Sequence, residues 1–274
     1  MTLDDESDPL SEAYNRGLAA ERAGDLDRAA AAFREVLRLD PADHGGASVR
    51  LAAIGQGPLP EKAPDAYVTT LFDQHASAFD DILVGRLHYR VPLLLADLLR
   101  EVAPGPYRRM LDLGCGTGLA GLALSEMTTR ITGVDLAEEM VALADERGVY
   151  DQLFIGEAVQ FLREEDDRHD LIVATDVLPY IGDLTPLVAA LAGCILPDGV
   201  IAFSSETAGE DEATWTVGAG HRFAHSERYI REVLVTQKFE VLAFEPITVR
   251  LEQEVPAPGH LIIARMPAAG SETL

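Results

Sequence analysis

The chain has 274 residues, of which 47% are hydrophobic, which is enough for one large domain and a small appendage. Its net charge of −24 disfavours polyphosphate backbones and anionic membranes, so we expect neither nucleic acid nor membrane as a partner. No apolar run approaches the roughly 18–20 residues that span a bilayer. The two cysteines, Cys115 and Cys194, are too few for a disulfide framework, and the acidic start lacks signal-peptide features. These features predict a cytoplasmic protein.

The first elements in chain order form a predicted helical hairpin over residues 10–43. Small and apolar residues recur at helical spacing on both sides of a break at Gly24 and Asp25. The pattern resembles one tetratricopeptide repeat, and a weaker helix is expected over 46–54. Because a lone repeat cannot bury its apolar face, we expect it to pack on the rest of the chain, on a second copy or on a protein partner. The positions that carry the resemblance are Gly17, Ala20, Gly24, Asp25, Ala29, Phe33, Leu37, Asp40 and Pro41.

A stretch rich in glycine and proline, residues 55–64, is the predicted boundary between a helical segment over 1–57 and a second domain over 65–274. Two helical patterns follow, and then strand-like and helical runs alternate, which indicates an α/β fold with a parallel sheet covered on both faces. The last β-like runs have little helix between them and predict an antiparallel hairpin at one edge. The expected helices lie near 65–84, 88–102, 118–127, 137–147, 157–163, 184–194 and 225–236, and the expected strands near 109–113, 130–135, 152–156, 170–175, 199–204, 239–245, 247–252 and 261–264.

The strongest local signal is a glycine loop within Met110–Gly118, of sequence MLDLGCGTG. An apolar strand runs into three glycines, and a helix follows. Glycine allows positive φ and lets a ligand approach the backbone closely. Asp135 ends the next strand, where a carboxylate is placed to bind ribose hydroxyls. The loop therefore predicts a nucleotide-type ligand at the carboxyl end of the sheet.

The glycine loop is compatible with two classes of ligand. Residues 116–121 (GTGLAG) also satisfy the dinucleotide pattern GxGxxG, which would indicate a nicotinamide dehydrogenase. Asp112, just before the loop, argues against this, because its carboxylate would repel a pyrophosphate and attract a sulfonium that carries an α-amino group. The terminal hairpin also differs from an all-parallel dinucleotide fold.

The loop resembles motif I of class I S-adenosylmethionine-dependent methyltransferases, and the similarity extends over roughly residues 66–265. With its repeat-like start, the whole chain is similar to bacterial tetratricopeptide-containing methyltransferases and, more loosely, to the ubiquinone/menaquinone and biotin-pathway methyltransferases. The resemblance implies a Rossmann-like, seven-stranded, mostly parallel sheet whose last two strands are antiparallel. It also implies S-adenosylmethionine as cofactor.

The resemblance implies a set of cofactor-binding residues, and several of them have a structural alternative. Asp112 could be bonded only to loop amides, Asp135 and Asp176 could be caps, and Glu157 could cap the helix that follows it. Phe72, Phe79 and Tyr89 lie in a segment similar to the helix that closes over the cofactor, or they are ordinary core residues. The implied cofactor-binding residues are Asp112, Gly114, Cys115, Gly116, Gly118, Asp135, Leu136, Met140, Glu157, Ala158, Thr175, Asp176, Phe79 and Tyr89.

The acceptor pocket is expected at the carboxyl edge of the fourth and fifth strands. Its catalytic candidates are Tyr180, His221 and His225, since imidazole suits general-base work near neutral pH. His225 or Ser226 could instead cap a helix, and because a third ligand to join a His-x3-His pair is missing, we expect no metal. The predicted activity is methyl transfer to a small molecule; a protein methyltransferase whose repeat recruits the substrate, or a non-catalytic cofactor-binding scaffold, stays open. The expected walls are Tyr180, Trp215, His221, Phe223 and His225, with Phe72 and Phe79 above them.

Overall fold

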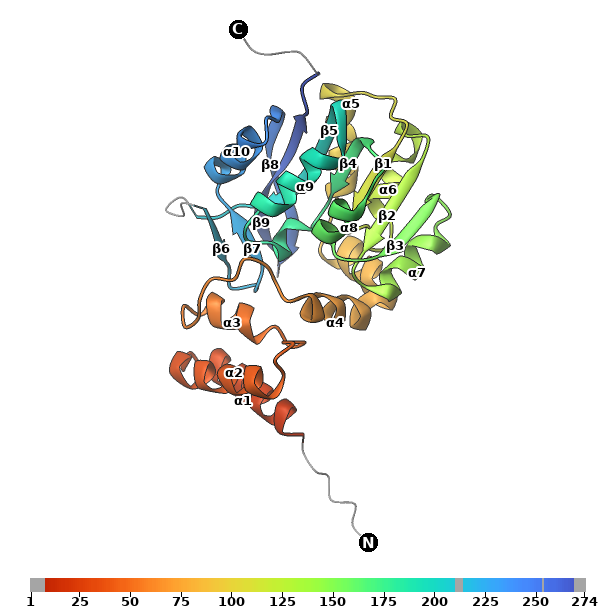
Figure 1. The fold of residues 1–274 in the computed structure, drawn as a ribbon. Helices are drawn as coiled ribbons and strands as arrows, with labels where there is room; N and C mark the ends of the chain where they lie inside the picture. The colour runs from red at the N-terminus through yellow and green to blue at the C-terminus, as the bar shows by residue number, and fades with distance from the viewer. Residues whose placement is uncertain (1–7, 210–213, 253, 269–274) are drawn as a thin grey trace.

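The structure, a computed structural model, describes residues 8–209, 214–252 and 254–268, and it consists of a helical N-terminal part below an α/β body (Figure 1). The N-terminal part begins with the predicted hairpin, α1 (Pro9–Arg22) and α2 (Leu26–Leu39), followed by α3 (Ala47–Ala53). Gly17 lies against Phe33, and a Cβ there would meet that ring at 2.5 Å. Glycine therefore allows α1 and α2 to pack closely.

The body contains a seven-stranded sheet in the order β3-β2-β1-β4-β5-β9-β8. The first five strands are parallel, while β9 is antiparallel to β5 and to β8. This confirms the predicted fold class. The three β-like runs at the end of the chain form two long strands, and β5 begins before the expected residue. The strands are β1 (Met110–Leu113), β2 (Ile131–Asp135), β3 (Gln152–Ile155), β4 (His169–Ala174), β5 (Ile195–Glu206), β8 (Glu240–Glu252) and β9 (Val255–Arg265).

Helices cover both faces of the sheet, as Figure 1 shows. Side chains alternate along each strand, so Leu111 and Ile172 face one hydrophobic core while Met110 and Leu171 face the other. The first core is closed by α8, α9 and α10, and the second by α5 and α6. Strands buried on both faces explain the continuous apolar runs in the sequence. The helices are α5 (Val91–Val102), α6 (Leu119–Leu124) with a 3-10 turn η3 (Ser125–Met127), α7 (Glu138–Glu146), α8 (Ala158–Glu164), α9 (Thr185–Cys194) and α10 (Glu227–Thr236).

The segment after the linker differs from the single helix expected over 65–84. It consists of α4 (Asp65–His75), a 3-10 turn η1 (Ala76–Ala78) and a π-helical turn η2 (Asp81–Arg86). Ala76 turns inward at the break and packs on Ala137 and Met140 at the start of α7. Tertiary packing on α7 therefore interrupts the helical pattern.

A two-stranded sheet that the sequence did not predict lies between β5 and α10. Its strands are β6 (Trp215–Val217) and β7 (Phe223–His225). Helix α10 begins at Glu227, after Ser226, whose side chain caps the helix by accepting from the Tyr229 amide at 3.2 Å. His225 is thus in a strand, and of the two residues considered as the helix cap it is Ser226 that caps α10. Within the described residues, groups of three or more metal-ligating side chains are absent.

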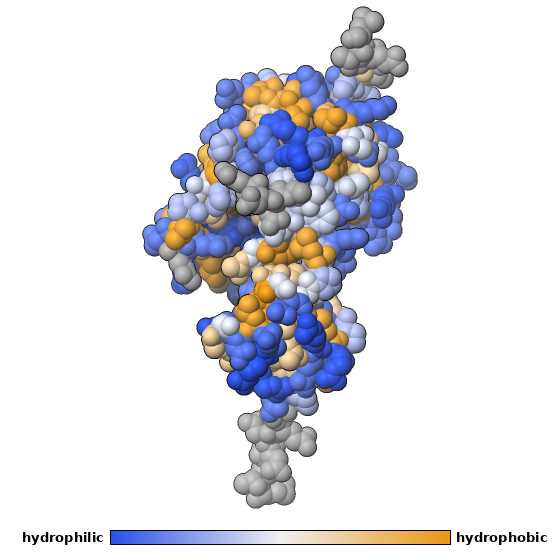
Figure 2. Space-filling model, turned by 90° about the vertical axis from the view of Figure 1, so that its left-hand side faces the viewer, coloured by the Kyte–Doolittle hydropathy of each residue, from blue (hydrophilic) through white to orange (hydrophobic). Residues whose placement is uncertain are grey.

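The N-terminal helices pack on the body through this β6–β7 hairpin. Val49 of α3 shares a buried hydrophobic cluster with Val217 and Phe223, and Figure 2 shows hydrophobic side chains gathered at the waist between the two parts. At the edge of the contact, His221 Nε2 lies 2.9 Å from Glu21 Oε1. The repeat is therefore seated on the rest of this chain. Among the described helices, none has the length and apolar character needed to cross a membrane.

The linker is fixed to the body. The Ala63 amide donates to the Tyr180 carbonyl at 2.9 Å, and the Gly182 amide donates to the Glu61 carbonyl at 2.7 Å. These bonds bring Lys62 and Ala63 to the carboxyl edge of the sheet, beside the cavity described next.

Candidate active site

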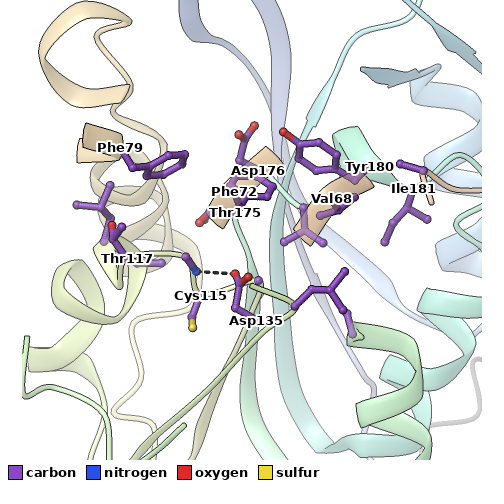
Figure 3. Close-up of a pocket in the computed structure, with 18 of the residues that line it drawn as sticks. Val68, Phe72, Phe79, Cys115, Thr117, Asp135, Thr175, Asp176, Tyr180 and Ile181 are labelled. Atoms are coloured by element: carbon purple, nitrogen blue, oxygen red, sulfur yellow. Dashed lines mark hydrogen bonds between the residues drawn. The ribbon is translucent and has the colours of Figure 1, made fainter. Parts of the chain in front are cut away.

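A cavity of about 940 Å3, including its open mouth, lies at the carboxyl end of the parallel strands (Figure 3). Its floor is the loop between β1 and α6, its sides are the ends of β2, β3 and β4, and its roof is the α4–η2 segment. We call it the cofactor cavity. It brings together most of the residues that the sequence assigned to the cofactor: Gly114, Cys115, Gly116, Asp135, Leu136, Glu157, Ala158, Thr175, Asp176, Phe79 and Tyr89.

The glycine loop has the backbone conformation that its sequence requires. Gly114, Gly116 and Gly118 have φ of 62°, 53° and 89°. A Cβ on Gly114 would lie 2.4 Å from a methyl group of Val177, whereas one on Gly116 would meet no atom within 4 Å. Gly114 therefore permits close packing in the protein, and Gly116 leaves its backbone open to a ligand.

Asp135 is held at the end of β2 by two backbone amides. Its Oδ2 accepts from the Gly116 amide at 2.8 Å, the bond dashed in Figure 3, and its Oδ1 accepts from the Ala137 amide at 2.9 Å. Burial raises the pKa of the Asp135 carboxyl, while these amides oppose the rise. The side chain thus caps the local backbone and lines the cavity at the same time.

Asp112 lies beneath the glycine loop and does not line the cavity. It is fully buried; its Oδ2 accepts from the Tyr150 hydroxyl at 2.7 Å, and its Oδ1 has no partner. Burial raises the pKa of this carboxyl to about 7. The structure also keeps Gly118 and Met140 out of the lining: Gly118 lies against Arg147 and Tyr150, and Met140 packs in the cluster under the roof. Asp112, Gly118 and Met140 therefore lie behind the cavity lining, whereas the sequence predicted that they bind the cofactor.

The roof rests on the body through aromatic and polar contacts. The Phe72 ring lies 5.7 Å from the ring of Phe79 and 5.3 Å from that of Tyr180, each in an edge-on arrangement. Asp80 accepts from the Thr117 hydroxyl at 2.6 Å and also pairs with Arg147. Asp80 therefore ties the roof directly to the glycine loop, a link that the sequence did not indicate.

Glu157 is both a helix cap and a residue of the cavity lining. Its Oε2 accepts from the Gln160 amide at 2.7 Å and so caps α8, while the side chain also lines the cavity. Its Oε1 lies 3.6 Å from the Lys62 ammonium. Lys62 was not predicted as a site residue, because it lies in a glycine- and proline-rich linker whose composition does not indicate a binding site.

A second cavity, of about 620 Å3, adjoins the first beneath the roof. We call it the acceptor cavity. The two cavities share Phe72, Phe79, Leu83, Asp176 and Tyr180 as a common wall. In Figure 3, Asp176 and Tyr180 lie next to Phe72, on the opposite side of the pocket from Thr117.

The far wall of the acceptor cavity is a charged cluster built around Arg222 and Arg250. Arg222 donates to the Tyr180 hydroxyl at 2.8 Å and to Glu206 Oε1 at 2.5 Å, and it pairs with Asp176. Arg250 donates to the same Glu206 oxygen at 2.6 Å. Burial raises the pKa of Asp176, while the Arg222 guanidinium opposes the rise. Neither arginine was predicted.

The predicted histidines do not line either cavity. His225 is fully buried, and its Nε2 lies 2.9 Å from the Ile181 carbonyl and 3.1 Å from the Gly182 carbonyl. Burial lowers the pKa of this imidazole to about 4, which keeps it neutral. His221 faces Glu21 in the N-terminal part. Both imidazoles therefore have structural contacts.

The aromatic residues predicted beside them also pack elsewhere. The Trp215 ring lies 5.4 Å from that of Tyr229, and Phe223 is fully buried in the cluster under α3. Tyr180 is the one member of the expected wall that lines the described cavities.

Comparison with known proteins assigns the two parts of the chain. Residues 111–203 match the model of a methyltransferase domain, and residues 11–43 match a tetratricopeptide repeat. Residues 111–203 therefore carry the signature of a methyltransferase domain. The methyltransferase match begins inside β1 and ends inside β5, so it contains the glycine loop, Asp135 and Asp176.

Curated relatives match the methyltransferase domain over part of their length. The ubiquinone biosynthesis O-methyltransferase of Bordetella avium is 30% identical over 124 residues, which cover 43% of this chain and 51% of the relative. The malonyl-[acyl-carrier protein] O-methyltransferase of Bacillus anthracis is 32% identical over 115 residues, or 41% of this chain and 42% of the relative. The chain thus spans about half the length of the curated relatives it matches.

Solved structures share the fold of the methyltransferase domain. Magnesium protoporphyrin IX methyltransferase from Synechocystis PCC 6803, solved with bound S-adenosylmethionine, has a TM-score of 0.57 at 16% identity, covering 76% of this chain and 98% of that one. The [4+2]-cyclase SpnF has a TM-score of 0.60 at 17% identity, covering 77% and 99%. At such identity the likeness shows the fold alone, and a cyclase among the neighbours illustrates that the fold does not fix the reaction.

Proposed function

We propose that the protein transfers the methyl group of S-adenosylmethionine to a small-molecule acceptor. The observation that supports this most is the contact between two cavities. One is built on a glycine loop and Asp135, and the other lies under the same roof, with Asp176 and Tyr180 between them. Such an arrangement suits a reaction in which one group moves in line between two bound molecules.

The residues of the cofactor cavity fit S-adenosylmethionine. The open space over Gly116 admits a ligand close to the backbone, and Asp135 offers a carboxylate to a ribose diol. Glu157 follows β3 and lines the cavity with Leu136 and Ala158, which supports binding of the adenine there. When bound, the cofactor supplies the reactive methyl carbon, and the protein orients the acceptor and excludes water.

The roof favours a small acceptor over a protein side chain. Asp80 fastens it to the glycine loop and to Arg147, and Phe72 and Phe79 line both cavities on the side of the roof. The N-terminal part packs on the β6–β7 hairpin through α3, and Glu21 of the repeat contacts His221, which leaves a thinner surface for recruiting a substrate protein. The free, buried thiols of Cys115 and Cys194 are in keeping with our proposal of a cytoplasmic protein.

A thermal-shift comparison tests the cofactor. A ligand that binds only the native state at 100 times its Kd raises stability by about 2.7 kcal/mol. We expect S-adenosylhomocysteine to raise Tm and NAD to leave it unchanged, because the carboxylates of Asp135 and Glu157 line the cavity and would repel a pyrophosphate. A larger shift with NAD would contradict the proposal.

A further inference from the structure

The wall that the two cavities share determines which chemical group can receive the methyl. Asp176 and Tyr180 line both cavities, at the carboxyl end of β4. They are the polar side chains among the five residues that the two cavities share. The accepting atom therefore lies against them when it is in line for transfer.

Asp176 is held in this place by bonds on several sides. Its φ is +61°, a conformation that is rare outside glycine, and its backbone amide donates to Ser204 Oγ at 2.9 Å. Its carboxylate is paired with Arg222. Strained backbone that its surroundings maintain is typical of functional positions. A carboxylate paired with a guanidinium accepts hydrogen bonds, so Asp176 favours a facing group that donates a hydrogen.

Both guanidiniums at the acceptor cavity are already paired with carboxylates of the protein. Asp176, Glu206 and Glu252 accompany Arg222 and Arg250, and Arg250 has only 5% of its side chain exposed. A carboxylate acceptor would add a further negative charge beside Asp176, and like charges in contact are costly. An ammonium acceptor has no free electron pair to attack with and would lie beside a guanidinium. An uncharged group avoids both penalties.

The opposite wall is apolar except for His75, whose Nδ1 lies 2.7 Å from the Leu71 carbonyl. Leu71, Ile82 and Leu87 of the roof face the acceptor cavity together with the shared Phe72, Phe79 and Leu83. These side chains can cover a hydrocarbon or aromatic body, which gains free energy by leaving water. The cavity thus offers an apolar surface to the body of a molecule and one hydrogen-bonding wall to its reacting group.

On the basis of the methyltransferase function proposed above, we propose that the acceptor cavity binds an uncharged, largely apolar molecule that is methylated on a hydroxyl group, and that Asp176 receives the hydroxyl proton. In the step, the oxygen–methyl bond forms as the sulfur–methyl bond breaks. The electron pair of the broken bond stays on sulfur, and the proton moves from the hydroxyl oxygen to the Asp176 carboxylate. Tyr180, whose oxygen accepts from Arg222, keeps its own proton to donate to the acceptor oxygen.

Two probes of matched size and shape test the acceptor class: 4-pentylphenol and 4-pentylbenzoate. Each is titrated calorimetrically into the full-length protein saturated with S-adenosylhomocysteine, at pH 7. We expect the phenol to bind at least ~10-fold more tightly, a difference of about 1.4 kcal/mol. Equal or tighter binding of the benzoate, or failure of the phenol to bind, would overturn the proposal.

A matched pair of variants tests whether Asp176 causes the preference for the phenol over the benzoate. Asp176→Asn keeps the size but can donate to a carboxylate, so we expect it to lose the ~10-fold preference and to slow labelled methyl transfer to the phenol by about 10²–10⁴-fold. The control, Asp97→Asn on α5, makes the same change at a side chain that is 76% exposed, and it should behave as the unaltered protein does. Retention of preference and rate in Asp176→Asn would refute the role of this residue.

The same titrations separate this inference from the function on which it rests. If S-adenosylhomocysteine fails to bind the unaltered protein, the methyltransferase function itself is wrong. If it binds but the benzoate is the preferred probe, only the assignment of an uncharged hydroxyl acceptor is wrong.

Discussion

The cofactor cavity and the acceptor cavity share a roof but are built in different ways. The first is formed by consecutive backbone, Gly114 to Gly116, and by residues at the ends of adjacent strands. The second depends on side chains from distant parts of the chain: Arg222 meets Asp176 across 46 residues, and Arg250 meets Glu206 across 44. A site made of local backbone geometry is visible in a sequence, whereas one made of long-range side-chain convergence is not.

The largest expected effect comes from replacing Arg222, at the centre of the charged cluster that forms the far wall of the acceptor cavity. In Arg222→Met, Asp176 and Glu206 lose a buried cationic partner, and breaking a buried ion pair typically costs about 3–5 kcal/mol. We expect a loss of that order in the free energy of unfolding, measured with urea. S-adenosylhomocysteine affinity in the folded variant should stay within about twofold, because Arg222 does not line the cofactor cavity.

Arg100→Met, at a half-exposed ion pair on α5, is the matched control and should change the free energy of unfolding by less than about 1 kcal/mol. If Arg222→Met is no more destabilising than this control, the charged cluster does not hold the acceptor wall together.

A smaller effect is expected from Asp135→Ala in the cofactor cavity. Hydrogen bonds to a charged group contribute about 1.5–3 kcal/mol each, so losing contact with a ribose diol should weaken S-adenosylhomocysteine binding by at least ~10-fold. Calorimetry measures this, and Asp97→Ala provides the exposed control. Unchanged affinity in a folded Asp135→Ala variant would show that Asp135 serves only the local backbone, through the Gly116 and Ala137 amides.

The smallest effect concerns the buried support of the cofactor cavity and depends on pH. The pKa of Asp112 is about 7 in the native state and near 3.8 when unfolded, so the native state binds this proton more strongly. The resulting stability is fully present below pH 3.8 and is lost as pH rises through about 7. Asp112→Asn replaces the titratable carboxyl with a neutral amide of nearly the same shape.

We therefore compare the free energy of unfolding of Asp112→Asn with that of the unaltered protein, measured with urea. The difference in favour of the variant should be larger at pH 8 than at pH 5, by at least about 1 kcal/mol. A pH-independent difference would mean that the carboxylate is ionised without penalty, and that the Tyr150 hydroxyl is a sufficient partner for it.

Much of the fold could be predicted because each element has its own pattern. The alternation of apolar strands and helices gave the sheet, and the change to β-like runs after residue 238 gave its antiparallel edge. The β6–β7 hairpin was missed because each strand has three residues, too short to show a period. The break after α4 was missed because it arises from packing on α7.

The same reasoning divides the residues of the site. Gly114, Gly116 and Asp135 could be placed because they belong to one continuous strand–loop–helix unit and the strand beside it. His221 and His225 were favoured as candidates for their chemistry alone, and the residue that reaches the cavity is Arg222, between them. His221 faces helix α1, and His225 lies in the core. The geometry of the β6–β7 hairpin decides which of these side chains reaches the cavity.

One peptide bond separates the contact with the repeat from the acceptor wall. His221 touches Glu21 of α1, and the next residue, Arg222, holds Asp176 and Tyr180. We therefore expect the N-terminal repeat to be thermodynamically linked to acceptor binding. A molecule that draws α1 away from the hairpin would change acceptor affinity by some factor, and bound acceptor would change the affinity of the repeat for that molecule by the same factor.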